Sequence, residues 1–315
     1  MTRIPIALAV LLMTIQWAAC QKPASSPTPS DAEHKNAKSA VKTSAPGATH
    51  KAAKGVDFAR KVIRIGVLND QSGPAATIGR SFGAGKRILA SQVNAGKSGI
   101  IPEGWTIELI ERDHAYNPGK SQQAFEAIKN DVLFLGLSFG TPTTLPLQPF
   151  LAKEKIVAFP ASLSSVMANH AYTPPVAPSY QIEAERALDW VVTTVKKPTE
   201  LKIAIVYQQD DFGKDALLGW QTSAKKHGVS IVAERPLKAG QKDVTAEIAS
   251  LKNSGATHIY LAVLPSSTGP VLGTAAAMQF MPEWIGATPA WLDVFFGHPK
   301  LPPAVFSHFH WVSGL

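Results

Sequence analysis

The sequence predicts an α/β protein with two lobes, each built on a doubly wound parallel sheet. Short β-branched runs alternate with amphipathic stretches of helical length, and the alternation starts again after Pro178. Strand–helix alternation at this spacing forms right-handed βαβ units and hence parallel sheets. Ligands of such sheets bind beyond the carboxyl ends of the strands.

The first series opens with a β-branched run at 62–68, which ends before Asn69 and Gly73 and is therefore expected to be a buried strand. The helix after it should turn an apolar face to the core, formed by Phe82, Ile88, Leu89 and Val93. Further strands are expected at 105–110, 132–137 and 156–159, and further helices at 118–130 and 143–153.

The second series repeats the pattern four times. Helices are expected at 182–196, 212–227, 244–254 and 273–278, and strands at 202–207, 230–234, 258–262 and 284–286, with the segment 289–296 following. A chain of 315 residues exceeds one hydrophobic core, which agrees with two domains.

The first twenty residues have the pattern of an export signal. Arg3 precedes a short apolar stretch, and Ala18 and Ala19 stand immediately before Cys20, the chain's single cysteine. This arrangement resembles a bacterial lipobox, with Trp17 where leucine is usual, and implies that Cys20 is lipidated. The alternative is a plain signal peptide. One cysteine excludes an intrachain disulfide and a zinc site of cysteine type.

Residues 21–55 are rich in Ala, Ser, Thr, Pro and Lys and are expected to form a flexible tether. The formal net charge of +8 is concentrated there, with six lysines against two acidic residues, whereas the remainder after residue 54 has 24 basic and 21 acidic residues. We therefore expect no nucleic-acid partner, and membrane contact through the lipid anchor only.

No enzyme motif is found. Gly83 to Lys86 lacks the first glycine of a P-loop, and neither G-x-G-x-x-G nor G-x-S-x-G occurs. His308 and His310 could form a metal pair on a strand, but no third ligand is evident, so ordinary strand residues are the preferred interpretation. The acidic pairs Glu183/Glu185 and Asp210/Asp211 are interpreted as helix-start residues rather than catalytic carboxylates. No catalytic residue, metal or cofactor is expected.

Small polar residues follow two expected strands of the first series. The stretch from Ser138 through Gly140 and Thr141 to Thr143 offers hydroxyls and bare backbone N–H groups, as does Ala161-Ser162. Such groups suit an anionic ligand such as a carboxylate. Alternatively, Thr143 is merely an N-cap and Ser138 a turn residue.

Four motifs in order resemble periplasmic binding proteins of the Leu/Ile/Val-binding (type I) class. They are the opening at 63–76, the loop at 138–144, the crossover at 178–183 and the loop at 210–215, where Phe212 replaces the commoner tyrosine. The resemblance covers about residue 61 to the end of the chain. It implies a Venus-flytrap receptor that captures a small solute and delivers it to the permease and ATPase subunits of an ABC importer. The expected location is the periplasm, anchored by lipid to a bacterial membrane.

The same resemblance implies the ligand contacts, which are Ser72, Ser138, Gly140, Thr141, Ala161 and Ser162 from the first lobe and Phe212, Leu264 and Thr288 from the second. Thr288 stands where amino-acid-binding members place an acidic residue for the ligand's ammonium. Since a buried ammonium needs a counter-charge, we expect a carboxylate-bearing solute without an α-amino group in preference to a branched-chain amino acid. A sensory ligand-binding domain and an exported α/β enzyme are the alternative functions.

The expected organisation is a signal peptide at 1–20, a tether at 21–55, lobe 1 at 56–178, lobe 2 at 179–308 and the start of a crossover at 309–315. Family members return to lobe 1 after a strand resembling 306–312, so lobe 1 is expected to lack its last part. Such a chain should expose apolar surface and aggregate or bind ligand poorly.

Overall fold

The computed structural model describes residues 53–96, 99–195, 200–299 and 301–313, which lie in one compact unit at 50–315. The predicted signal peptide, Cys20 and most of the tether lie outside these residues. Two five-stranded sheets organise the described part, as the sequence predicts.

The first sheet has the strand order β1-β2-β4-β5, with β3 paired to the other side of β2. All its pairs are parallel except the antiparallel pair of β1 with β2. The two-residue strand β1 was not predicted. The strands are β1 (Val56–Asp57), β2 (Val62–Asn69), β3 (Thr106–Asp113), β4 (Phe134–Phe139) and β5 (Ala158–Ala161).

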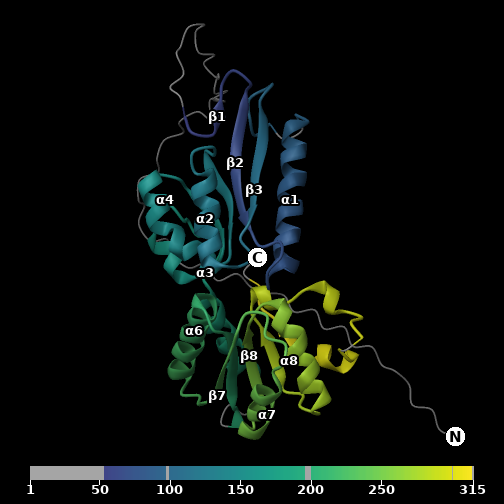
Figure 1. The fold of residues 1–315 in the computed structure, drawn as a ribbon. Coiled ribbons are helices and arrows are strands. Elements are labelled where there is room, and N and C mark those ends of the chain that lie inside the picture. Colours follow the sequence, from purple (N-terminus) through teal and green to yellow (C-terminus); the bar gives the residue numbers. More distant parts are fainter. Residues whose placement is uncertain (1–52, 97–98, 196–199, 300, 314–315) are drawn as a thin grey trace, which may run out of the picture. The chain divides into compact units, whose positions relative to one another are not determined.

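Helices cover both faces of this sheet, with α1 (Ala76–Asn94) on one side and α2 (Pro118–Ile128) and α4 (Gln148–Glu154) on the other (Figure 1). The helix predicted at 143–153 is divided into α3 (Thr141–Thr144), a 3₁₀ turn (Leu145–Leu147) and α4. Each piece has a proline in its first turn. Proline suits a helix start but removes a donor from a helix interior, which explains the division.

The predicted core face of α1 is wrong except for Val93. Phe82, Ile88 and Leu89 are 44%, 60% and 49% exposed. The buried side of α1 is formed instead by small residues and Val93, because the helix lies very close to the strand ends: a Cβ on Gly79 would lie 1.8 Å from the carbonyl oxygen of Asp70. Large side chains do not fit there.

The second sheet has the order β10-β9-β8-β6-β7 and is parallel throughout. Its strands are β6 (Ile203–Gln208), β7 (Ile231–Leu237), β8 (His258–Ala262), β9 (Glu283–Gly286) and β10 (Phe309–Trp311). Its helices are α5 (Tyr180–Thr194), α6 (Asp211–His227), α7 (Thr245–Ser254) and α8 (Pro265–Ala277). In Figure 1, α6 lies on one side of the strands and α7 and α8 on the other.

Several boundaries in this half differ from the prediction, two of them in segments that contain proline. The helix expected at 273–278 begins eight residues earlier, because Pro265 occupies its first turn and Pro270 is accommodated inside it. The strand expected at 306–312 is reduced to β10, since Pro303–His308 form a 3₁₀ helix. No helix of the described residues is long and apolar enough to cross a bilayer.

Candidate functional site

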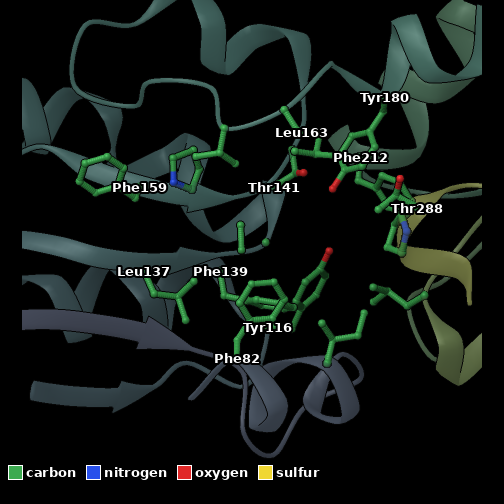
Figure 2. Close-up of a pocket in the computed structure, with 18 of the residues that line it drawn as sticks. Phe82, Tyr116, Leu137, Phe139, Thr141, Phe159, Leu163, Tyr180, Phe212 and Thr288 are labelled. Carbon is green, nitrogen blue, oxygen red and sulfur yellow. The ribbon is translucent and has the colours of Figure 1, made fainter. Parts of the chain in front are cut away.

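A cavity of about 520 Å³ lies at the carboxyl ends of strands from both sheets. Its size falls within the usual range for small-molecule sites. Figure 2 shows aromatic rings along much of its wall, with Phe82, Tyr116 and Phe139 near one another, and Tyr180 and Phe212 across the space from them. The wall is predominantly apolar, so the cavity suits a ligand with a hydrophobic body.

Helix α1 contributes one stripe of the wall. Ile78, Phe82 and Lys86 are spaced four residues apart, so they share one face of the helix, and all three line the cavity. Phe82 meets the edge of Phe139, the last residue of β4, with ring centroids 5.9 Å apart. Phe82, which does not fit against the sheet, therefore forms part of the cavity wall.

The loop after β3 supplies Tyr116, which is buried and adopts a left-handed backbone with φ of 57°. Its hydroxyl accepts a hydrogen bond of 3.3 Å from Nε2 of Gln208 at the end of β6. Burial is the main reason that the pKa of the Tyr116 phenol is held well above its ordinary value, so the hydroxyl stays protonated. A protonated hydroxyl keeps its own hydrogen to donate.

The start of α6 forms the opposite wall. Asp210 caps this helix by accepting from the backbone N–H groups of Phe212 and Gly213, which confirms its interpretation as a helix-start residue. The cap fixes Phe212, whose ring lies 4.6 Å from that of Tyr180 in an edge-on contact. Both rings line the cavity.

The hydroxyls of the predicted carboxylate loop are largely engaged inside the fold. Ser138 bonds to Thr144 at 2.8 Å, and the hydroxyl of Thr143 donates to the carbonyl of Phe139. Thr141 and Ser162 bond to each other at 2.7 Å. Because two hydroxyls share one hydrogen in such a pair, one hydrogen of the Thr141–Ser162 pair is left to donate elsewhere.

Thr288 is held from behind by a buried carboxylate. Glu183, which is 5% exposed, accepts from the backbone N–H of Thr288 at 2.7 Å, from its hydroxyl at 2.5 Å and from the hydroxyl of Tyr260 at 3.1 Å. Burial raises the pKa of Glu183, and these hydrogen bonds oppose the rise. Glu183 thus fixes the segment after β9 to α5, a role that its position in a first helical turn does not reveal.

No Asp or Glu is among the described residues that line the cavity. The nearby buried acids serve the backbone instead: Asp70 accepts from the N–H groups of Gly73 and Ala75, and Asp210 caps α6. Burial raises the pKa of Asp210, and its hydrogen bonds to Gln208 and to the backbone oppose the rise. Lys86 is the single charged side chain among the described lining residues.

A family model described as periplasmic binding protein matches residues 62–293. The chain belongs to this family. The family and its curated relatives are solute-binding proteins rather than enzymes. The family implies an exported periplasmic protein.

The curated relatives of this binding protein are distant. The Leu/Ile/Val-binding protein of Citrobacter freundii is 22% identical over 228 residues, covering 72% of this chain and 61% of the relative. The leucine-specific-binding protein of Salmonella typhimurium is 25% identical over 233 residues, covering 71% and 62%. The chain therefore spans about three-fifths of the length of these relatives.

Solved structures show the same fold. A fatty acid ABC transporter substrate-binding protein from Thermomonospora curvata has a TM-score of 0.76 at 24% identity, covering 82% of this chain and 65% of the other. An R. palustris solute-binding protein in complex with 4-hydroxybenzoate has a TM-score of 0.64 at 20% identity, covering 78% and 66%. The prediction of a type I periplasmic binding protein fold is confirmed.

Most of the predicted contact residues of this binding protein gather at the cavity. Six of the nine line it, namely Gly140, Thr141, Ala161, Phe212, Leu264 and Thr288. Ser138 and Ser162 are buried behind it, and Ser72 is exposed and donates to Asp113 at 2.6 Å. These three are not lining residues.

Sequence reasoning missed Tyr116, Tyr180 and the α1 stripe. Tyr116 follows the carboxyl end of β3 by three residues, so the rule that ligands bind beyond strand ends could have identified it. Phe82 was assigned to the core because its spacing fits a core face as well as a cavity wall.

The two histidines near the end of the chain pair with one carboxylate. Glu283 bonds to His308 at 2.8 Å and to His310 at 3.0 Å, although His308 lies in a 3₁₀ helix and only His310 lies on β10. Among the described residues no cluster of His, Cys, Asp and Glu is suited to a metal ion. These contacts join β10 to β9 at their amino-terminal ends.

Proposed function

We propose that this chain is the extracytoplasmic solute-binding receptor of an ABC importer and that it captures a small organic acid without an α-amino group. The observation that supports this proposal most directly is the cavity wall, which is apolar and has no acidic side chain among its described residues. Family membership and the ABC-transporter receptors among the solved structures support the receptor role.

The ligand class follows from the cost of burying an ammonium. A buried cation without a counter-charge or full hydrogen bonding is strongly unfavourable. Glu183 lies behind Thr288, but its carboxylate already accepts three hydrogen bonds from the protein. A carboxylic acid avoids this cost. The names of similar proteins mention branched-chain amino acids, a fatty acid and 4-hydroxybenzoate, and each of these ligands has a carboxylate.

In this proposal the segments 56–178 and 179–308 are the two ligand-binding lobes. Gly140, Thr141 and Ala161 contact the ligand from the first, and Phe212, Leu264 and Thr288 from the second. Ser72, Ser138 and Ser162 act indirectly, since their hydroxyls are bonded within the protein.

Export and anchoring complete the proposal. Residues 1–20 direct export, Cys20 becomes the lipidated residue, and the tether 21–55 holds the receptor at the membrane near its permease and ATPase partners. Cys20→Ser should abolish incorporation of radiolabelled palmitate and release the protein from the membrane fraction. Unchanged labelling would refute the anchor but not the ligand class.

A matched pair of ligands tests the ligand class. Leucine and 4-methylpentanoate share the side chain and carboxylate and differ in the ammonium. In calorimetry and thermal-shift measurements on the purified chain, 4-methylpentanoate should bind more tightly and raise the melting temperature more, since a ligand at 100 times its Kd adds about 2.7 kcal/mol of stability. Tight leucine binding without binding of simple carboxylic acids would overturn the proposal.

A further inference from the structure

Lys86 is a cation without a protein partner in an otherwise apolar wall. Within the described residues its ammonium has no hydrogen bond or ion pair, and no titratable group shifts its pKa; burial alone lowers that pKa. The next residue differs, because Arg87 pairs with Glu111 at 2.7 Å and does not line the cavity. The structure therefore leaves one lining charge unneutralised.

The positions of Ile78 and Lys86 on α1 define the length of the stripe that lines the cavity. Ile78 and Lys86 both line the cavity and are eight residues apart on α1, which corresponds to roughly 12 Å along the helix axis. Ile78 packs against the cluster that holds Tyr116 and Leu264, at the carboxyl ends of the strands. Phe82 lies between the two and adds an aromatic surface that is 44% exposed. The stripe thus runs from the strand ends to a cation.

We propose that Lys86 binds the carboxylate of the ligand, whose extended apolar body lies along the α1 stripe with its far end toward Ile78 and Tyr116. This inference rests on the proposed function and deepens it: the ligand is an unbranched or para-extended monocarboxylic acid about as long as the stripe, rather than a compact acid of leucine size. It also moves the anionic end of the ligand away from the loop at 138–143, whose hydroxyls are mostly engaged internally.

Two physical effects support this placement. A carboxylate paired with Lys86 in apolar surroundings gains a charge-assisted hydrogen bond that is stronger than one in water. Each methylene laid against the wall contributes the free energy of its burial. A lysine that merely extends its ammonium to water while its aliphatic part covers the cavity would not form this hydrogen bond.

The test compares straight-chain alkanoates with alkanols of equal length, measured by calorimetry on the purified chain and three variants. For the wild type, affinity for alkanoates should rise about fourfold per methylene and level off once the chain fills the stripe. Lys86→Met should weaken alkanoate binding about 10- to 100-fold and leave alkanol binding within about twofold. Lys86→Arg should retain most of the alkanoate affinity.

Arg87→Met is the matched control, because it removes the neighbouring charge on the same helix outside the cavity wall and should not change alkanoate affinity. Equal losses for alkanoates and alkanols in Lys86→Met, or no loss for either, would overturn the assignment of Lys86 while leaving the receptor function intact. If no carboxylic acid of any length binds the wild type, the proposed function fails with it.

Discussion

Replacing Thr288 by valine tests whether this lining residue supports the cavity wall or contacts the ligand through its hydroxyl. The structure directs that hydroxyl away from a ligand, to Oε2 of Glu183 at 2.5 Å and to the carbonyl of Val312 at 3.2 Å. Valine has nearly the same shape, so the change removes the hydrogen bond and leaves the wall in place. We expect a loss of stability with little loss of ligand affinity.

The size of the loss depends on the charge of Glu183. A hydrogen bond to an ionised group contributes about 1.5–3 kcal/mol, and one between neutral groups about 0.5–1.5 kcal/mol. Because burial raises the pKa of Glu183 above its usual 4.5, more than half of the carboxyl is protonated at pH 4.5, and it ionises as the pH rises. Thr288→Val should therefore cost about 1.5–3 kcal/mol at pH 8 and less at pH 4.5.

Urea unfolding at the two pH values measures this difference. Thr268→Val is the control: Thr268 is fully buried whereas Thr288 is partly buried, and the Thr268 hydroxyl bonds to the neutral carbonyl of Leu264 at 3.3 Å, so the cost of this change should not depend on pH. A cost for Thr288→Val below about 0.5 kcal/mol at pH 8, or one that matches the control at both pH values, would refute the reasoning. A large loss of ligand affinity would show that the hydroxyl serves the ligand.

Three further predictions concern stability and solubility. Gly219→Ala should destabilise the protein by more than about 2 kcal/mol in urea unfolding, because the new Cβ would lie 2.1 Å from a carbonyl oxygen of α5, whereas Gly85→Ala, with no atom within 4 Å, should stabilise by about 0.5–1 kcal/mol. The raised pKa of Glu183 makes the folded state bind more protons than the unfolded state above about pH 4.5, so the unfolding free energy of the wild type should fall as the pH rises. Glu183→Gln removes this titration and should make the fall smaller. A pH dependence equal to that of the wild type would contradict this. The double change Ile88→Lys and Leu89→Glu should raise the monomeric fraction in size-exclusion chromatography, because these side chains are 60% and 49% exposed; an unchanged elution profile would argue against aggregation through α1.

The alternation of elements was predictable because its signals are local. The run at Val62–Asn69 is β-branched and ends at turn residues, and the start of α2 has both an Asn117 cap and a proline in the first turn. The strand ends also brought six of the nine predicted residues to the cavity. These features depend on a few neighbouring residues, which a single sequence contains.

The errors arise where the outcome depends on what a side chain faces. Phe82 has the helical spacing of a core residue, but the sheet accepts the small residues of α1 and Phe82 lines the cavity instead. Periodicity alone does not separate a core face from a cavity wall. Similarly, Glu183 was interpreted only as a helix-start acid, since its partners Thr288 and Tyr260 are 105 and 77 residues away. Contacts between residues so far apart in the sequence depend on tertiary packing, which local sequence patterns do not reveal.

The acidic residues near the cavity bear on how a predominantly apolar wall with a single lysine could favour an anionic ligand. Asp70 and Asp210 direct their carboxylates to backbone N–H groups, and Glu183 directs its own to Thr288 and Tyr260. Burial raises the pKa of both Asp210 and Glu183, and their hydrogen bonds oppose the rise. The negative groups near the cavity thus serve the wall rather than the ligand, and the unpaired ammonium of Lys86 is left as the strongest charge that a ligand meets. Under the proposed function, this arrangement of four side chains would select an acid over an amino acid without a dedicated anion-binding loop.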